Sequence, residues 1–297
     1  MANRQECFVL LRTGWRPGMA EFSGMIRARY PELGRVAGTD GPPDSGMPST
    51  VLIDGITISM SIVNAPYPPE ALLSPTRLID HVDPEPLVAN QAAYVLLAVE
   101  GPDIDPQAFG KAAAEASEIA QAYAALLTLA ASVVAAEAPA MAAFWADSWR
   151  LVPPERLVEA GEGIMDGRLP WELWTSFAEV KGARAGGGDN RALISFGLRK
   201  FAGREVEVAP SPIPLVEAEK LAQAMVGRLI AGDQPVDHEE TTLGSDTAVL
   251  RRAERFLRPR HPALVVVPAS SPWDPETLED KRTRNRRSGL VGRLFGG

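Results

Sequence analysis

The stretch Val51-Leu52-Ile53-Asp54-Gly55-Ile56-Thr57-Ile58-Ser59-Met60-Ser61-Ile62 decides the fold class, because two apolar runs flank an Asp-Gly pair. Asp-Gly readily adopts the positive φ angles of a type I′ turn, so the pattern predicts a β-hairpin. In the second run, apolar residues alternate with Thr57, Ser59 and Ser61. This alternation predicts a strand with one buried and one polar face, as in an antiparallel sheet.

Strands and helices are also predicted on both sides of this hairpin. Residues 8–11 are a short apolar run, and a helical pattern begins at Pro17. Residues 92–99 are almost continuously apolar, which predicts a central strand. Asp105 and Pro106 then suit the N-cap and first position of a long helix over residues 106–136.

The second half of the chain repeats these kinds of element. We expect strands at 171–180 and 192–196, then a strand, turn and strand over 196–208. A helix is predicted over 213–231, and a buried strand over 263–267. For 248–256 the sequence leaves strand and helix open.

Strand runs interrupted by single helices predict an α+β fold, with mostly antiparallel sheets packed against a few helices. We predict an N-terminal domain (1–137), a C-terminal domain (138–268) and a flexible basic tail (269–297). Both halves contain strands, a helix and a hairpin, so two similar halves are one interpretation. No residue pattern repeats between them, and a duplication stays a hypothesis.

Composition narrows the functional classes. The 297 residues include one cysteine and carry a net charge of −8. No intrachain disulfide can form, and with no secretory leader or membrane span expected, a cytoplasmic protein is predicted. Residues 281–297 contain six basic side chains and no acidic one. The rest has 24 basic against 38 acidic residues, a balance of −14. Nucleic acid is therefore not an expected partner. The acidic balance permits a basic protein partner, and ordinary solubility is the other interpretation.

Residues for catalysis, metal or cofactor binding do not form recognisable sets. The three histidines, His81, His238 and His261, have no ligand-like spacing to one another or to cysteine. Val236-Asp237-His238-Glu239-Glu240 is the most ligand-like cluster, and we interpret it as a solvated acidic loop. Leu243-Gly244-Ser245-Asp246-Thr247 lacks the second glycine of a nucleophile elbow. We predict no catalytic residues, no metal and no cofactor.

A candidate binding surface is suggested by tryptophans that cluster within 30 residues. Such a cluster lines a pocket or a protein-binding face, or it packs the core. Glu205 and Glu207 lie two apart in a predicted strand and so share a face, and Arg199 precedes them. The candidate surface consists of Trp145, Trp149, Trp171, Trp174, Arg199, Glu205 and Glu207.

Residues Ser195-Phe196-Gly197-Leu198-Arg199-Lys200-Phe201-Ala202-Gly203-Arg204-Glu205-Val206-Glu207-Val208 resemble the signature of the bacterial domain of unknown function family 4261. Thr241-Thr242-Leu243-Gly244 is similar to a later motif of that family. Phe144-Trp145 and Pro153-Pro154 also fit its upstream region. The resemblance covers mainly residues 140–265, and Ala202 replaces the usual glycine after Phe201. It implies a fold neighbourhood and no reaction, because the family has no assigned activity.

Three functions remain open. The first is a non-enzymatic protein-binding module of the immunity or adaptor type. The second is an enzyme of unfamiliar design, with Glu205, Glu207 and Arg199 around a pocket floored by Trp171 and Trp174. The third is membrane contact through the basic C-terminal tail. The acidic body and the aromatic cluster favour the first.

Overall fold

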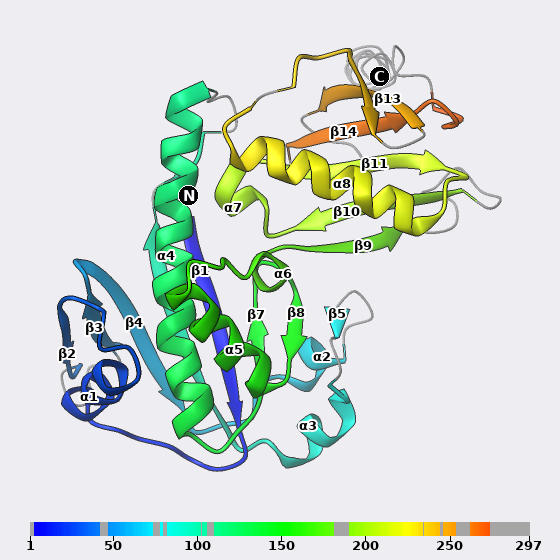
Figure 1. Cartoon of the computed structure of the whole chain (residues 1–297). Helices are drawn as coiled ribbons and strands as arrows, with labels where there is room; N and C mark the ends of the chain where they lie inside the picture. The colour runs from blue at the N-terminus through cyan, green and yellow to red at the C-terminus, as the bar shows by residue number, and fades with distance from the viewer. Residues whose placement is uncertain are drawn as a thin grey trace, which may run out of the picture. The chain divides into compact units, whose positions relative to one another are not determined.

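The computed structural model describes residues 3–41, 47–73, 78–79, 82–101, 103–105, 110–180, 190–233, 235–243, 246–253 and 262–273. The chain divides into two compact units, which are described separately. Unit 1 consists of Met1–Asp105, Glu115–Ser176 and Phe196–Phe201, and unit 2 of Pro106–Ala114, Phe177–Ser195 and Ala202–Gly297. Helices and mostly antiparallel sheets make up both, which confirms the α+β class (Figure 1).

Unit 1 is built on an eight-stranded sheet of order β2-β3-β4-β6-β1-β7-β8-β5. Neighbouring strands in this sheet pair antiparallel, except for β5 and β8, which pair in parallel. The strands are β1 (Asn3–Leu11), β2 (Val36–Thr39), β3 (Ser49–Ile53), β4 (Ile56–Val63), β5 (Leu78–Ile79), β6 (Ala93–Gly101), β7 (Ala140–Trp145) and β8 (Arg150–Val152).

The division into units differs from the domain boundary predicted between residues 137 and 138. β7 begins just after that boundary, and it pairs with β1 from Cys7 to Leu11. Strand pairing thus joins residues on both sides of the predicted boundary into one sheet. Most of the predicted tail lies outside the described residues, including all of 274–297.

The predicted hairpin is confirmed as β3 and β4, which pair from Ser49 with Met60 to Ile53 with Ile56. Asp54 and Gly55 both have positive φ angles, of 48° and 89°. The Asp54 carboxylate also accepts a hydrogen bond from the Arg35 backbone N–H at 2.8 Å. Ile58 and Met60 are buried while Thr57 is exposed, as the alternation predicts.

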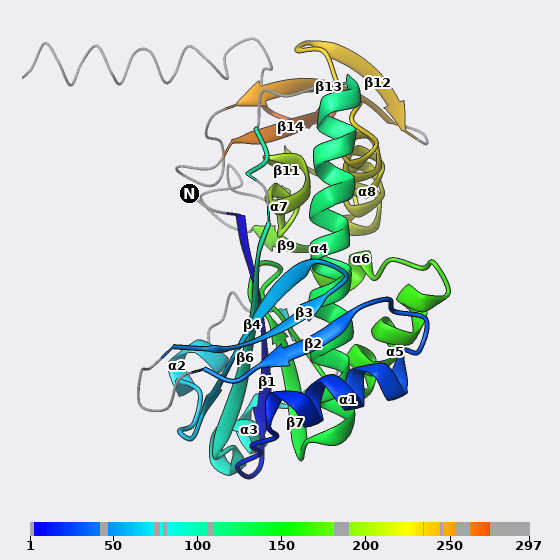
Figure 2. The same cartoon turned by 90° about the vertical axis from the view of Figure 1, so that its left-hand side faces the viewer.

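One face of this sheet packs against helices α1 (Met19–Arg29), α4 (Gly110–Glu137) and α5 (Pro154–Met165). α4 runs along the sheet and passes close to β1 (Figures 1 and 2). Its small side chains allow this approach. The shared core includes Cys7, Val9, Val95, Leu97, Ala124, Leu127, Ala130, Val133 and Val134.

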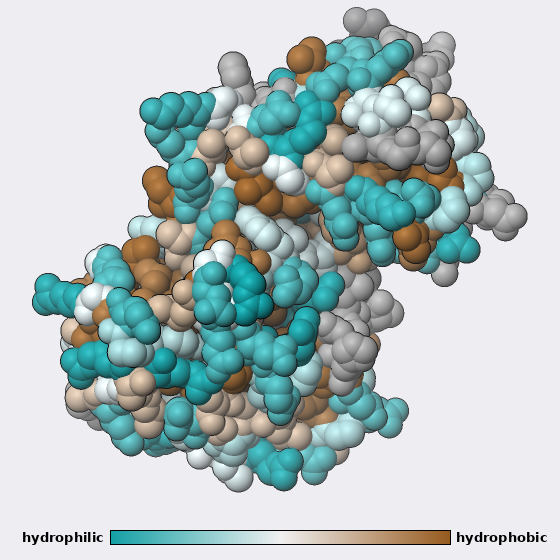
Figure 3. All heavy atoms as spheres, in the orientation of Figure 1, coloured by the Kyte–Doolittle hydropathy of each residue, from teal (hydrophilic) through white to brown (hydrophobic). Residues whose placement is uncertain are grey.

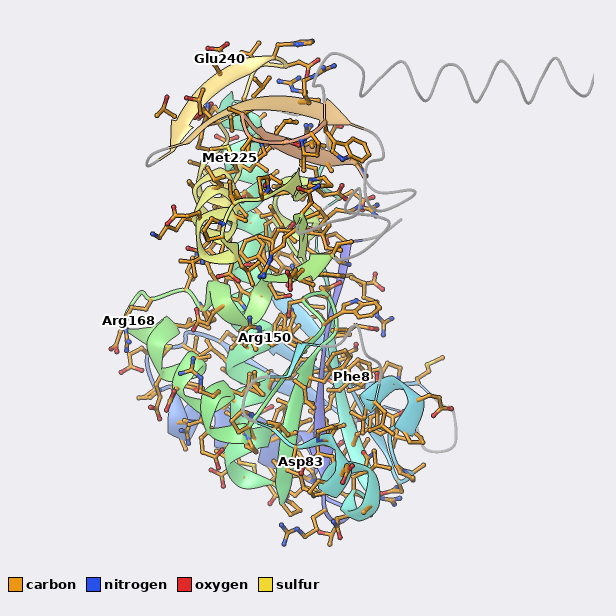
Figure 4. All side chains as sticks on the ribbon, turned by 90° about the vertical axis from the view of Figure 1, so that its right-hand side faces the viewer. Phe8, Asp83, Arg150, Arg168, Met225 and Glu240 are labelled. Carbon is orange, nitrogen blue, oxygen red and sulfur yellow. The ribbon has the colours of Figure 1, made fainter. Side chains whose placement is uncertain are left out.

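The opposite face is covered around β1, β7 and β8 by a smaller cluster. Phe8, labelled in Figure 4, meets the rings of Tyr67, Tyr94 and Phe144 at centroid distances of 5.0, 6.0 and 5.9 Å. Leu72 of α2 (Pro69–Leu72) and Leu87 of α3 (Pro84–Asn90) belong to the same cluster. The Asp83 carboxylate caps α3 by accepting from the Glu85 N–H at 3.0 Å.

Unit 2 contains a six-stranded sheet of order β12-β13-β14-β11-β10-β9. β11 and β14 pair in parallel, whereas β10–β11, β13–β14 and β12–β13 are antiparallel. Helix α8 (Leu215–Ile230) packs against β11. The strands are β9 (Ser176–Val180), β10 (Arg191–Phe196), β11 (Glu205–Ser211), β12 (Glu239–Leu243), β13 (Asp246–Ala253) and β14 (Ala263–Pro268).

α4 is long and apolar enough to cross a membrane by length and composition alone. Of its most apolar 18-residue window, 61% is buried within the protein, as in the core helix of a soluble protein. Within the described residues, α4 is therefore packed as a core helix.

Candidate functional site around Trp149

Most of the tryptophan cluster belongs to the core of unit 1. Trp145 on β7 and Trp174 on α6 (Trp171–Trp174) are 1% and 0% exposed. Trp174 stacks on Phe201 at 5.5 Å and meets Trp171 edge-on at 5.3 Å. Its indole N–H donates to Thr128 Oγ1 of α4 at 3.0 Å. These three tryptophans pack against other rings, as the alternative interpretation of the cluster expects.

Trp149 differs from the other three in exposure and backbone conformation. Its side chain is 37% exposed, and its φ angle is 58°. A bulky residue in this left-handed region is uncommon and strained. The ring rests against Phe196 at 5.6 Å, which fixes one of its faces. Over the surface drawn in Figure 3, apolar residues lie among hydrophilic ones. An exposed indole that is held against Phe196 on one side suits a binding surface.

The turn that carries Trp149, residues 146–149, is fixed by hydrogen bonds on both sides. The Trp149 N–H donates to the Ala146 carbonyl at 3.2 Å. Ser148 is fully buried, and its hydroxyl donates to the Leu173 carbonyl at 2.6 Å. The Ser176 hydroxyl donates to the Ser148 carbonyl at 2.5 Å. These hydrogen bonds hold the backbone of Trp149 in its strained left-handed conformation.

Asp147, in the same turn, forms an ion pair with Lys200 of α7 (Arg199–Ala202), with Nζ 3.3 Å from Oδ1. The Glu6 backbone also acts on this carboxylate and lowers the pKa of Asp147. Its Oδ2 is buried, and among the described residues it has no hydrogen-bond donor. Lys200 Nζ also donates to the Arg4 carbonyl, and the Asn3 side-chain amide donates to the Lys200 carbonyl at 2.8 Å.

Burial raises the pKa of Asp147 from 3.8 to about 6, although Lys200 acts in the opposite direction. Desolvation is the largest cause, because a charged carboxylate loses its water there. Glu6 raises the pKa further by repulsion. Asp147 therefore changes charge close to physiological pH.

The segment Phe196–Phe201 completes this region of unit 1. Gly197 has a φ angle of 87°, and a Cβ there would overlap the Trp174 carbonyl oxygen. Leu198 is fully buried, while Phe201 lies between Trp171 and Trp174. Arg199 of the candidate surface is exposed. α6 and α7 are short helices where the sequence predicted a strand and a turn, because ring packing and Gly197 set the local backbone.

Glu205 and Glu207 belong to β11 of unit 2 and are 4% and 0% exposed. Glu205 accepts a hydrogen bond from the Ser195 hydroxyl at 2.6 Å. The same hydroxyl accepts from the Val206 N–H at 2.8 Å. Both carboxylates are buried because β11 is an inner strand between β10 and β14. Unit 2 holds these two carboxylates, whereas unit 1 holds Arg199 and the four tryptophans.

The acidic segment Val236–Glu240 forms hydrogen bonds with two arginines. Asp237 accepts from Arg251 Nε at 3.1 Å, and Glu239 accepts from Arg228 at 2.8 Å. The Arg228 hydrogen bond lowers the pKa of Glu239. Glu239 starts the edge strand β12, where we expected loop. Within the described ranges, no three His, Cys, Asp or Glu side chains gather as a metal site. Ser245, His81 and His261 lie outside those ranges.

Cys7 is a buried member of the unit 1 core, where its thiol packs as a small apolar side chain. Burial raises the pKa of its thiol, which keeps the sulfur protonated.

In comparisons with known proteins, no family model, curated protein or solved structure matches this chain. The resemblance to the domain of unknown function family 4261 stays a prediction.

Sequence reasoning selected Trp149 but missed Asp147 and Lys200. They are 53 positions apart, Asp147 lies in none of the quoted motifs, and the Ser195–Val208 signature contains Lys200 without singling it out. Two features of the fold bring them together. β7 pairs with β1, and the chain returns to unit 1 at Phe196–Phe201. Ala146-Asp147-Ser148 has the composition of a turn, which was the one available signal.

Proposed function

We propose that this chain is a cytoplasmic, non-enzymatic protein-binding module of the immunity or adaptor type, which contacts its partner through the surface around Trp149. The proposal depends chiefly on one observation: Trp149 is exposed although its backbone is strained. Strain of this kind costs on the order of 1–3 kcal/mol and persists only where surrounding contacts impose it. Such sites concentrate where a protein binds or acts.

The physical properties of Trp149 suit an interface anchor. Tryptophan contributes large contact area, and it is enriched among the few residues that dominate binding energy. Contacts with Phe196 and the Ser148 hydrogen bonds hold the ring before a partner arrives. Such preorganisation lowers the entropy cost of association.

The charge of the chain supports a basic partner. Residues 1–280 carry a balance of −14, so their field attracts positively charged proteins at low ionic strength. Near Trp149 both signs occur, with Asp147, Glu6, Lys200 and Arg4 close to the turn. We therefore infer that the net charge speeds the encounter with a basic partner, whereas the Trp149 indole supplies most of the binding energy.

The test begins with affinity capture from a native lysate, followed by identification and purification of the captured protein. Its Kd is then measured by calorimetry with wild type, Trp149→Ala and Leu73→Ala. Leu73 is a matched control, because it is also an exposed apolar residue of unit 1. Trp149→Ala should weaken binding by about 30-fold, the effect of a hot-spot residue of about 2 kcal/mol. Leu73→Ala should leave the Kd within twofold.

Equal affinity of the wild type and Trp149→Ala for the purified partner would refute the assignment of this surface. If no stoichiometric partner is captured at low salt, the binding function itself is refuted. Raising the salt concentration should slow association and leave dissociation almost unchanged, since the charges act at long range.

A further inference from the structure

A small hollow in unit 1 lies between strand β8 and helices α5 and α6. It encloses about 240 Å³ of space, part of it open to solvent. Drug-sized ligands occupy pockets of about 300–1,000 Å³, so a hollow of this size suits a smaller molecule. Its lining residues all belong to unit 1 and are Arg150, Val152, Arg156, Ala160, Glu172 and Leu173.

The spacing of the lining residues explains why they meet. Arg150 and Val152 lie two apart in β8 and therefore share one face of the strand. Arg156 and Ala160 lie four apart in α5 and share one face of that helix. The short helix α6 supplies the remaining two residues.

The apolar part of the lining comes from the core of unit 1. Val152 and Leu173 are 3% and 5% exposed, and Ala160 packs against the same core. Leu173 is also held through its backbone, because the Ser148 hydroxyl donates to its carbonyl at 2.6 Å. These three side chains form a preformed apolar wall that suits a short aliphatic group.

The charged part of the lining carries both signs, with two arginines and Glu172. Arg156 lies in the first turn of α5, and the positive end of the helix dipole adds to its charge. Its Nη1 donates to Glu159 at 2.9 Å. A guanidinium has five N–H groups, so Arg156 can bind a second carboxylate at the same time.

We propose that this hollow binds a free α-amino acid with a small aliphatic side chain, such as valine. The carboxylate of the ligand binds Arg150 and Arg156, and its ammonium group binds Glu172. Its side chain packs against the apolar wall. The site goes beyond the proposed function, because it takes a small molecule and requires no protein partner.

The two signs of charge select against simpler ligands. A carboxylate without an ammonium group is repelled by Glu172, and an amine without a carboxylate is repelled by the two arginines. In a zwitterion, each charge meets the opposite charge and can form a charge-assisted hydrogen bond. The lining therefore favours a molecule that carries both groups over one that carries either alone.

The experiment is an NMR titration of the isotope-labelled, full-length protein with L-valine. Backbone amides within residues 150–160 and 171–173 should shift until saturation, with a Kd on the order of 1 mM for so small a ligand. 3-Methylbutanoate lacks the ammonium group and isobutylamine lacks the carboxylate. Each should bind at least about tenfold more weakly than L-valine, because each loses a hydrogen bond between charged groups.

Two substitutions at exposed positions separate the two charges. Arg156→Gln and Glu172→Gln should each weaken L-valine binding by about tenfold. Glu172→Gln should also tighten the binding of 3-methylbutanoate, because it removes the repulsion. Arg168→Gln is the matched control and should leave the Kd within twofold. Arg168 is also an ion-paired arginine, 2.9 Å from Asp166, and Figure 4 shows it well apart from Arg150.

An absence of shifts at L-valine concentrations well above the expected Kd would overturn the site. Equal affinities of the wild type for L-valine and 3-methylbutanoate would do the same, as would equal affinities of the wild type and Arg156→Gln for L-valine. The comparison of the three ligands uses the wild type alone, so it decides the matter even if a variant folds poorly. None of these measurements depends on the partner experiment.

Discussion

At the scale of single residues, Trp149 combines a backbone suited to glycine with the largest side chain. A left-handed conformation brings Cβ close to the carbonyl oxygen in any residue except glycine. The surrounding hydrogen bonds through Ser148 impose this conformation. The strain and the ring contact can be separated by two substitutions at the same position.

Trp149→Gly should be more stable than Trp149→Ala by about 1 kcal/mol, although both remove the ring. Both variants lose the contact with Phe196, so the difference between their free energies of unfolding measures the strain at the φ angle of 58°. Urea denaturation at pH 7 measures it. Equal stability, or a more stable alanine variant, would show that the backbone is not strained at this position.

Ser195 and Ser211 form a matched pair of buried hydroxyls on neighbouring strands of unit 2. Ser195→Ala should lower the free energy of unfolding by about 2 kcal/mol, because Glu205 and the Val206 N–H each lose a partner. The Ser211 hydroxyl has no hydrogen bond among the described residues. Ser211→Ala should therefore be neutral or slightly stabilising, and a larger loss there than at Ser195 would contradict the assignment.

At the scale of elements, the sequence predicted what depends on local patterns. Alternation and Asp54-Gly55 predicted the hairpin, and apolar spacing predicted α4 and α8 within a few residues. For 248–256 the strand alternative is confirmed over the described part by β13. Features set by distant contacts were missed. Trp171–Trp174 is a helix because its rings pack on Phe201, and Glu205 and Glu207 are buried because β11 is an inner strand.

Gly197 tests how tightly the segment Phe196–Phe201 is fixed. Gly197→Ala combines a left-handed φ angle with overlap on the Trp174 carbonyl oxygen, and should cost about 3 kcal/mol or more. Gly167 has a similar φ angle of 78° but open space around it. Gly167→Ala should cost only about 1 kcal/mol. Thermal unfolding of both variants measures the difference, and equal losses would mean that the segment has room to shift.

At the scale of the whole molecule, Asp147 links stability to pH. Its pKa is raised on folding, so the folded chain holds the Asp147 proton more tightly than the unfolded chain. The contribution of this group to stability therefore decreases as the pH rises from 4 to 6, and stays low above that range. A rise from 3.8 to about 6 corresponds to about 3 kcal/mol as an upper bound.

Asp147→Asn should consequently be more stable than the wild type at pH 8 by about 1–3 kcal/mol. Loss of the ion pair with Lys200 reduces this gain. At pH 4 the two proteins should be nearly equal, because Asp147 is then protonated. Denaturant titrations at both pH values measure this difference. A gain that is the same at pH 4 and pH 8 would exclude the proton as its cause.

The discontinuity of unit 1 limits how this chain can be divided. Phe196–Phe201 belongs to its core, while the residues before and after that segment belong to unit 2. A gene fragment ending at Ser176 would encode Trp174 without Phe201, which stacks on it. Recombination could therefore not transfer unit 1 to another protein as one contiguous cassette, and the two units are expected to be inherited together.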